Sequence, residues 1–502
     1  MAAYSRYDQL SVSLDRSAPS SLPSQLVEQI RGLIASGHLT PGDPLPSTRS
    51  LAERLNVSRG TVVFAYEQLV GEGYIVSSRG GTQVAAGANF ARLPQDQGLP
   101  ASNPLRGRPE PAPSPSDQGV IDLRPGQPDT SLVATASWRA AWRAAAAQPG
   151  LTYPAAGSLE LRYQLVEHLR MMRSVLREPD DLLVTAGARD GFRLVLTLLR
   201  RRVRNRPLRI AVEEPGFPSL HRIPLAFGHE ILPMPVDSQG LNPAHLPSGE
   251  GRPDLVLVAP SHQYPLGASL PLARRLELLA WAQDSGAFIV EDDYDSELRY
   301  VGDPLPALAS LDRPSGRPGL EAHPANWSND RVITLGSFAK MLAPGLNLGF
   351  VLLPRHLRSA ALELREDTGN PVSSISQQAM THFLAAGGLR RHTARMRRVY
   401  RARRQLLLEE LTGVRGIRVL PMDGGLHAVL ELTRGSASLE RDLLARSRQA
   451  GLLLAPLGAY WSTRGQGQVG AGPMYGLVLG FGGVSDRQLL QGLALLKEVL
   501  KS

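Results

Sequence analysis

A single lysine, Lys340, stands in an otherwise uncharged run between Thr334 and Phe350. Residues 332–335 are typical of a strand, Gly336 of the turn at its end, and residues 348–353 of the next strand. A lysine on such a connection is half buried, and burial disfavours its ammonium form. The neutral amine can then form a Schiff base with a carbonyl compound. The alternative is a surface lysine on a loop.

An acidic segment supplies a second set of reactive groups. The apolar strand predicted at 287–290 ends in the run Glu291-Asp-Asp-Tyr-Asp295. Ligands of open α/β sheets bind beyond the carboxyl ends of strands. Because residues two apart on a strand share a face, Asp292 and Tyr294 should point together. One carboxylate and one phenol suit a pyridinium nitrogen and a ring hydroxyl. The alternative is a solvated acidic loop.

Three motifs together resemble one family. Ser337-Phe-Ala-Lys340, Glu291-Asp-Asp-Tyr-Asp-Ser-Glu297 and Pro260-Ser-His-Gln-Tyr-Pro-Leu-Gly267 are similar to those of MocR-type regulators, which include GabR-like and PdxR-like proteins. The resemblance covers nearly the whole chain from about Leu22. It implies a GntR-type winged-helix head and a fold-type-I aminotransferase-like body, with pyridoxal 5'-phosphate bound at Lys340.

The resemblance also implies the remaining cofactor residues. Phe217 would stack on the pyridine ring, His262 would lie beside the ring hydroxyl, Ser337 would bind the phosphate, and Tyr153 would reach the cofactor phosphate of a partner in a homodimer. The alternatives are a core phenylalanine, a structural histidine in a turn, and plain packing of Tyr153.

A phosphate loop is expected after the buried strand at 182–185. The segment Ala186-Gly-Ala-Arg-Asp-Gly191 is a small-residue turn that opens a helix predicted at 192–199. Such a turn presents free N–H groups to a phosphate. The signal is weak alone, and the resemblance assigns Gly187, Ala188 and Arg189 to the phosphate.

Residues 22–85 predict a winged helix-turn-helix. A helical stripe ends at Gly37, Pro41–Pro46 is predicted as a rigid turn, two capped helices follow, and a glycine-tipped hairpin ends the unit. The DNA-facing residues would be Arg49, Ser58, Arg59, Thr61, Arg79 and Gly81. Residues 1–85 carry seven arginines and seven acidic residues, so placement rather than net charge favours DNA. The alternative is a winged helix used for protein contact.

The chain is too long for one hydrophobic core. We expect a DNA-binding head at 1–85, a flexible proline-rich linker at 86–117, a large α/β cofactor domain with a mostly parallel sheet at 118–355, and a small α+β domain at 356–502. The net charge of +9 makes a polyanion partner plausible, although an arginine-rich composition alone would also produce it.

The composition excludes some classes of protein. The sequence has no cysteine, which rules out disulfides and thiolate metal sites, and no metal is expected. No apolar signal core or bilayer-spanning run is seen, so we expect a cytoplasmic protein without a membrane partner.

Two positions depart from the family pattern. Asn347 stands where many relatives have an arginine on the phosphate, and Met474-Tyr475 stands where GabR-like members hold an amino-acid carboxylate with an arginine. Arg189 is expected to replace the missing arginine; alternatively it points to solvent or pairs with Asp190. An arginine run on one helix, from Arg390 to Arg404, is either a solvated face or a path for bent DNA.

These observations predict a transcriptional regulator that binds a double-stranded DNA operator. Its effector would be a small molecule, more plausibly pyridoxal 5'-phosphate itself because the carboxylate-binding arginine is missing. The target genes would belong to vitamin B6 or amino-acid metabolism. The rival hypotheses are an active aminotransferase with an accessory head, and a structural dimer that binds no cofactor. Whether transaminase activity survives is left open.

Overall fold

The computed structural model describes residues 12–18, 20–78, 81–86, 119–150, 154–203, 206–302, 305–312, 330–461 and 474–501. The chain divides into two compact units, Met1–Arg108 and Pro109–Ser502. We call them the head and the body and describe each by itself. Most of the predicted linker, 87–117, lies outside the described residues.

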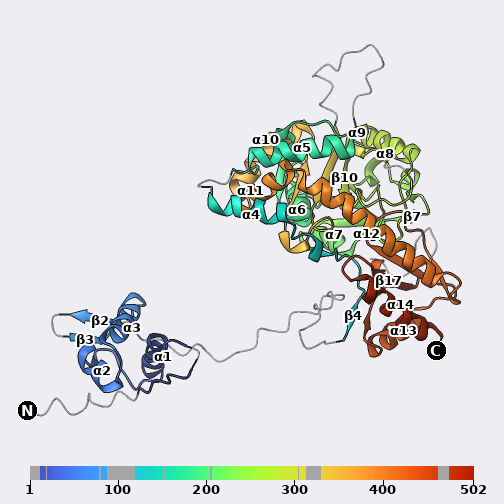
Figure 1. Cartoon of the computed structure of the whole chain (residues 1–502). Helices are drawn as coiled ribbons and strands as arrows, with labels where there is room; N and C mark the ends of the chain where they lie inside the picture. The colour runs from blue at the N-terminus through green and yellow to red at the C-terminus, as the bar shows by residue number, and fades with distance from the viewer. Residues whose placement is uncertain are drawn as a thin grey trace, which may run out of the picture. The chain divides into compact units, whose positions relative to one another are not determined.

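Three helices and a small sheet form the head (Figure 1). The helices are α1 (Leu22–Ala35), α2 (Thr48–Leu55) and α3 (Arg59–Gly71), and each begins after a serine whose side chain accepts a backbone hydrogen bond: Ser21, Ser47 and Ser58. Such caps satisfy N–H groups that have no partner within the helix. The predicted winged helix-turn-helix is therefore confirmed.

The sheet of the head has one more strand than the sequence pattern predicted. Its order is β1 (Pro44–Leu45), β3 (Gly81–Val84) and β2 (Ile75–Ser78), with both pairings antiparallel. Residues 44–45 lie within the segment that we predicted as a rigid turn. Two residues are too few for a periodic pattern, and the strand exists only because Leu45 pairs with Thr82.

An eight-stranded sheet forms the centre of the body. Its order is β5-β12-β11-β10-β9-β6-β7-β8, and β11, β10, β9, β6 and β7 run parallel to one another. The antiparallel strand β12 separates β11 from β5. The bounds are β5 Leu182–Thr185, β6 Arg209–Glu214, β7 Glu230–Asp237, β8 Gly240–Leu241, β9 Leu255–Val258, β10 Phe288–Asp293, β11 Val332–Ser337 and β12 Gly349–Leu352.

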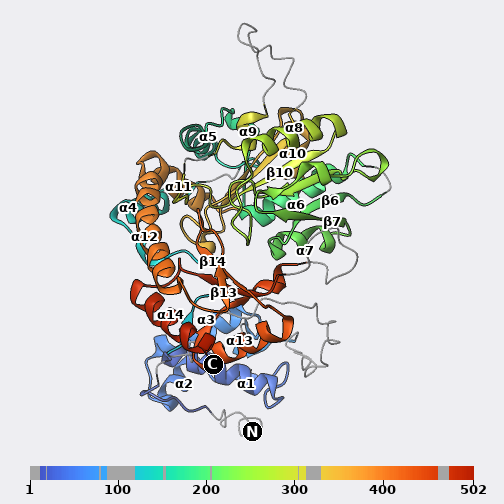
Figure 2. The ribbon, with the colours of Figure 1, turned by 90° about the vertical axis from the view of Figure 1, so that its right-hand side faces the viewer.

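Helices cover both faces of this sheet, as Figure 2 shows. Alternate strand residues enter two separate cores: Leu183, Val290 and Leu335 pack in one, and Leu182, Ile289 and Val332 in the other. Burial on both faces explains why the strands are continuous apolar runs. The helices are α4 Ala136–Ala147, α5 Leu159–Arg173, α6 Gly187–Arg200, α7 Pro218–Ala226, α8 Leu272–Ser285, α9 Leu308–Leu311, α10 Arg358–Thr368, α11 Ser374–Ala385, α12 Gly388–Leu411, α13 Ala437–Gln449 and α14 Asp486–Lys501.

A second, four-stranded sheet lies in the C-terminal part of the body. Its order is β13 (Ile417–Val419), β14 (His427–Leu432), β17 (Gly476–Gly480) and β16 (Ala455–Pro456), all antiparallel. The first strand of the body, β4 (Ile121–Asp122), pairs with β15 (Leu452–Leu453). The beginning of the body is thus fastened to its C-terminal part.

Gly336 is not the turn that we predicted at the end of its strand. It lies within β11 and pairs with Phe350 of β12. A Cβ on Gly336 would overlap the ring of Phe350. The glycine is needed because that ring lies against the strand, and the polypeptide turns only after Ser337.

The arginine run of α12 is partly structural. Arg403 is buried and bonds to Asp129 and Asp486. Arg404 donates to the Met422 carbonyl at 2.5 Å, and Arg395 donates to the Leu132 carbonyl. Arg391 and Arg398 are exposed. The run is therefore not a uniform solvated face, since several of its guanidinium groups hold the body together.

Candidate functional site

The carboxyl ends of the parallel strands bring the predicted residues to one edge of the sheet. Asp292 lies near the end of β10 and Tyr294 just after it, Ser337 is the last residue of β11 and Lys340 follows it, and Phe217 follows β6. In the register of the sheet, Asp293 is opposite Gly336. Parallel neighbours end at the same edge, which is where ligands of such sheets bind.

Lys340 lies just beyond β11 and is partly buried. Its Nζ donates to the Gly126 carbonyl at 2.6 Å. Burial lowers the pKa of the Lys340 amine; the carboxylates of Asp295 and Asp292 oppose that effect, and Arg189 adds to it. A lowered pKa increases the fraction of neutral amine, which is the nucleophilic form.

Asp292 is a buried acid without a hydrogen bond. Its side chain is 8% exposed, and Oδ1 has no hydrogen-bond partner among the described residues. Burial, with a contribution from Asp293 and Asp295, raises the pKa of the Asp292 carboxyl to about 7. An unpaired buried carboxylate is costly. A protonated ring nitrogen placed here would satisfy it, so the residue fits a pyridine cofactor.

Tyr294 and His262 form one hydrogen-bonded unit with Asp295. The Tyr294 hydroxyl donates to the His262 carbonyl at 2.7 Å, and His262 Nδ1 lies 2.9 Å from Asp295 Oδ2. Burial raises the pKa of the Tyr294 phenol well above its usual value. The phenol therefore stays protonated and can act as a hydrogen-bond donor. Asp295 was not among the predicted site residues, although it lies in the same acidic motif.

The predicted phosphate loop is the first turn of α6. The sequence placed the start of this helix at Phe192, but it begins at Gly187, and no side chain caps it. Gly187 has a φ of +75°, which favours glycine. Gly187, Ala188 and Arg189 are thus its first three residues, whose N–H groups have no partner within the helix. Asp190 suits the positive end of the helix dipole, which explains the earlier start.

Arg189 does not pair with Asp190. The Asp190 carboxylate bonds instead to Arg193 at 2.9 Å and to the buried Arg365 at 2.5 Å. Arg189 makes no ion pair or hydrogen bond among the described residues. Its charge contributes to the lowered pKa of Lys340, so it lies within electrostatic reach of that amine.

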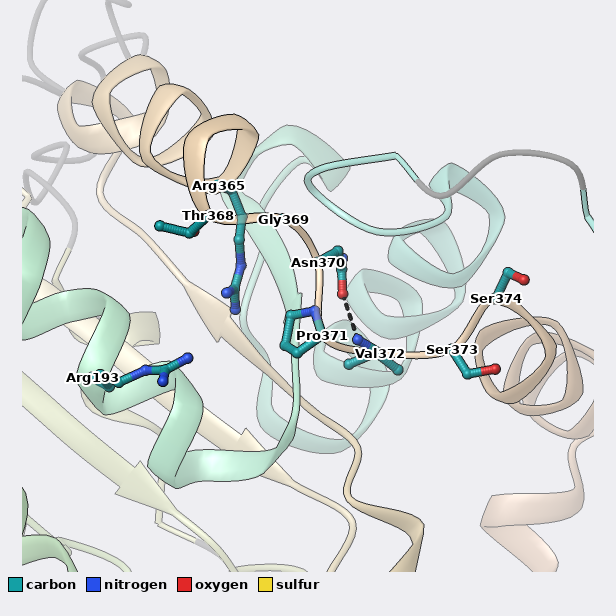
Figure 3. A pocket seen from close by; sticks show the side chains of 9 residues that line it. All are labelled: Arg193, Arg365, Thr368, Gly369, Asn370, Pro371, Val372, Ser373 and Ser374. Atoms are coloured by element: carbon teal, nitrogen blue, oxygen red, sulfur yellow. Dashed lines mark hydrogen bonds between the residues drawn. The ribbon is translucent and has the colours of Figure 1, made fainter. Parts of the chain in front are cut away.

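Arg193 and Arg365 also line a cavity of about 550 Å³ (Figure 3). The other lining residues are Thr368, Gly369, Asn370, Pro371, Val372, Ser373 and Ser374, between the end of α10 and the start of α11. Of the predicted cofactor residues that the structure describes, none is among these lining residues.

Ser337 and Asn347 lie at the two ends of the connection between β11 and β12. The Ser337 hydroxyl accepts a hydrogen bond from the backbone of Ala339 at 3.2 Å. Asn347 has a φ of +47°, a left-handed conformation that asparagine adopts more readily than arginine does. Its Oδ1 lies 3.7 Å from the place that a Cβ on Gly187 would take. Asn347 therefore lies next to the first residue of α6.

Aromatic residues cover the site beside Phe217. The ring of Phe217 meets that of Tyr264 edge-on at 5.3 Å between centroids. The Tyr264 hydroxyl lies 3.2 Å from that of Tyr460, and His427 donates from Nε2 to the Pro265 carbonyl at 2.8 Å. Burial lowers the pKa of His427 to about 3, so it is neutral. We did not predict Tyr460 and His427, because neither lies in a motif.

In the head, the predicted DNA residues gather at the start of α3 and on α2. Ser58 caps α3, and its Oγ accepts from the Thr61 N–H at 3.1 Å. Arg59 is exposed in the first turn of α3. Arg49 is exposed on α2 and lies 3.2 Å from Glu53. Gly81 begins β3 with a φ of +120°. Tyr153 and Arg79, predicted as cofactor and DNA residues, lie outside the described residues.

Comparisons with known proteins agree with this arrangement. Residues 22–84 match the profile of bacterial regulatory proteins of the gntR family. The chain is 42% identical over 474 residues, 94% of each protein, to the HTH-type pyridoxine biosynthesis transcriptional regulator PdxR of Corynebacterium glutamicum. It is 31% identical over 503 residues, 96% of this chain and 94% of the relative, to the probable rhizopine catabolism regulatory protein MocR of Rhizobium meliloti.

The chain belongs to the MocR group of GntR-family transcriptional regulators. The predicted family and the prediction of a DNA-binding regulator are therefore confirmed.

Solved aminotransferases share the fold of this MocR-type body. The kynurenine aminotransferase of Pyrococcus horikoshii superposes with a TM-score of 0.64 at 23% identity, over 76% of this chain and 91% of that one. The α-aminoadipate aminotransferase LysN of Thermus thermophilus superposes with a TM-score of 0.63 at 24% identity, over 76% and 92%. These likenesses confirm the predicted fold-type-I body and concern the fold alone.

The described part of the chain contains no group of three or more histidine and acidic side chains arranged to hold a metal ion. None of its helices combines the length and apolar character needed to cross a bilayer.

The buried state of Asp292 predicts a pH-dependent stability. Folding raises the pKa of this acid from its ordinary value of 3.8 to about 7. Its ionisation therefore destabilises the folded protein increasingly as the pH rises from 3.8 to about 7. Asp292→Asn should therefore stabilise the cofactor-free protein more at pH 8 than at pH 5, by about 2–4 kcal/mol at pH 8. Chemical denaturation of the wild type and of Asp292→Asn, both without cofactor, measures this difference in the free energy of unfolding at both pH values.

Asp293→Asn is the matched control. Asp293 pairs with the buried Arg173 at 2.9 Å, so its loss should destabilise the protein at both pH values. A stability difference between Asp292→Asn and wild type that is the same at pH 5 and pH 8 would contradict the assignment.

Proposed function

We propose that this MocR-type regulator binds pyridoxal 5'-phosphate at Lys340 and that the occupancy of this site alters its binding to DNA. The supporting observation is the buried Asp292 carboxylate, which has no hydrogen bond to any residue that the structure describes although it lies at the edge of the sheet where ligands bind in such folds. A structural acid at this depth would be expected to have a partner.

Pyridoxal 5'-phosphate would supply an aldehyde, a basic ring nitrogen and a phosphate dianion. Lys340 offers the amine, Asp292 would hold the proton of the ring nitrogen, and the Tyr294 oxygen, whose O–H donates to the His262 carbonyl, would accept from the ring hydroxyl. The first N–H groups of α6, Ser337 and Arg189 would bind the phosphate. Phe217 would lie on the ring, with His262 held in place by Asp295.

We propose that the target genes are those of vitamin B6 supply. One relative of similar length is described as a pyridoxine biosynthesis regulator. A regulator that binds the end product of a pathway can sense its concentration directly. We further propose that the DNA-binding domain spans 1–85 and a flexible linker 86–117, and that the cofactor domain and the small domain span 118–355 and 356–502.

The protein would act as a homodimer in the cytoplasm, where its operator lies. A dimer would present two heads to two half-sites of a double-stranded operator. In the head, Arg49, Ser58, Arg59, Thr61, Arg79 and Gly81 would contact DNA.

Lys340→Ala should abolish the response to the cofactor. The sequence contains three lysines, and the other two, Lys497 and Lys501, lie on α14 in ion pairs with Glu410 and Glu498. The wild type should show a visible absorbance band with pyridoxal 5'-phosphate and a change in its operator footprint. The Lys340→Ala protein should show neither, because no other amine is at the site.

Lys497→Ala serves as the control and should behave as the wild type does. Pyridoxamine 5'-phosphate, which lacks the aldehyde, tests whether the covalent bond is needed for the response. An unchanged band and an unchanged footprint response in Lys340→Ala would refute the proposal.

The second candidate is an aminotransferase, which the fold of the body favours. We expect conversion of the cofactor to its pyridoxamine form by ordinary amino acids to be slow or absent. The reason is that Asn347 and Met474 offer no guanidinium for the phosphate or for an amino-acid carboxylate. Spectra recorded after mixing with each common amino acid measure this. Full conversion within seconds would show that the body is an enzyme.

Arg189 is proposed to compensate for the neutral Asn347. Arg189→Ala should cost about 1.5–3 kcal/mol, the scale of a hydrogen bond to a charged group, or roughly 10- to 150-fold in affinity for pyridoxal 5'-phosphate. Adding Asn347→Arg should restore much of that loss, because residue 347 lies next to Gly187. Fluorescence titration of the proteins gives the dissociation constants.

Arg193→Ala is the control for this experiment. Arg193 lies one turn further along α6 and pairs with Asp190, so its removal should change the affinity little. If Arg189→Ala binds the cofactor as tightly as the wild type does, Arg189 has no role at the phosphate.

A further inference from the structure

Phe64 is an apolar side chain on the outward face of α3. It is 59% exposed, the highest value among the large apolar side chains that the structure describes. The buried residues of the helix are Val62, Ala65, Tyr66 and Leu69. At 100° per residue, Phe64 lies on the opposite side of the helix from this row. Nothing in the core of the head requires an aromatic ring at this position.

The surroundings of Phe64 leave its ring open to a large partner. Gly60 lies one turn earlier on the same face and has no side chain. A Cβ there would have one neighbour within 4 Å, the Ser58 Oγ at 3.7 Å. Glu67, one turn later on this face, is exposed. Gly60 thus leaves open space on this face in the turn before Phe64, so a flat surface can approach the ring.

The outward face of α3 suits DNA better than it suits a protein partner. A protein contact would need a contiguous apolar patch. Around Phe64 the outward face of α3 offers Gly60, Glu67 and Gln68, none of which is a large apolar residue, while Val70, 42% exposed, lies about 120° away around the helix. In a helix-turn-helix, by contrast, the N-terminal part of the second helix enters the major groove.

Phe64 lies in the second turn of α3, within the N-terminal half of the helix. Arg59, in the first turn, lies five residues earlier, a rise of roughly 7.5 Å along the helix axis and a rotation of roughly 140° about it. A recognition helix lies in the major groove with its N-terminal residues at the base edges, so a side chain of the second turn can reach a base edge. The apolar group that the groove presents to a phenyl ring is the C5-methyl group of thymine.

We propose that Phe64 contacts a thymine methyl group in each half-site and is a specificity-determining residue of this regulator. The inference rests on the DNA-binding role of the head and is independent of the cofactor. Phosphate contacts position a protein on DNA, whereas a contact with a base edge selects sequence. Phe64 would thus add a sequence preference that the arginines of the head do not supply.

The test uses the full-length protein and a duplex that it selects from a random pool. Each thymine of that duplex is then replaced in turn by uracil, which removes only the methyl group. At one thymine per half-site, the wild type should lose roughly 4-fold in affinity, the value for one buried CH₂-sized group. Gel-shift titration at fixed salt gives the affinities.

Phe64→Ala should bind the unmodified duplex more weakly and be indifferent to uracil at that position. Alanine favours the helix, and the thermal midpoint of the variant shows that the head is folded. Phe64→Leu keeps an apolar side chain and should retain part of the uracil effect. Val70→Ala should match the wild type, and Arg59→Ala should bind more weakly while keeping the uracil effect.

A uracil profile of Phe64→Ala identical to that of the wild type would overturn the proposal, with or without a change in affinity. If Phe64→Ala instead changes the oligomeric state and leaves the uracil profile intact, Phe64 contacts protein and the proposal is wrong. Failure of the wild type to select any duplex would refute DNA binding by the head itself, which is a different result.

Discussion

The body of this protein is built around acids that are buried at the ligand-binding edge of its sheet. Moving a carboxylate out of water is costly unless charges or hydrogen bonds replace the lost solvation. Asp293 has Arg173, and Glu291 accepts from the backbone of Leu308 at 2.9 Å. Among the described residues Asp292 has no hydrogen-bond partner, whereas Asp293 is paired through one of its two carboxylate oxygens. The fold thus leaves the Asp292 carboxylate unpaired, and a cationic group supplied by a ligand would satisfy it.

The same edge determines the properties of Lys340. Burial lowers the pKa of the amine, and the nearby carboxylates of Asp295 and Asp292 limit that effect. The amine of Lys340 and the carboxyl of Asp292 thus both titrate closer to neutrality than they would in water. Perturbed groups of this kind occur together at functional sites more often than at structural ones. A cationic ring nitrogen and a carbonyl carbon would satisfy both groups at once.

The head and the body meet different physical demands. A cofactor bound in the body would need protection from water, and the proposed site has buried aromatic rings such as Tyr264 and Tyr460. A head that binds DNA must approach a charged duplex, and its proposed contact residues Arg49 and Arg59 are exposed. This division explains why one chain can combine an aminotransferase fold with DNA binding and why the fold alone does not identify an activity.

Local patterns in the sequence were enough to predict the family, the winged helix and the lysine with its acidic partners. Serine caps, apolar periodicity and short motifs depend on neighbours a few residues away, so they can be recognised without the tertiary structure.

Tertiary contacts decided the rest. Gly336 belongs to a strand because the ring of Phe350 lies against it, and His427 and Tyr460 reach the site from a distant part of the chain. Arg403 is buried between two acids although it lies in a run of arginines typical of a surface. The sequence likewise could not predict that Asp292 is unpaired, because whether a buried charge has a partner depends on every segment that packs around it.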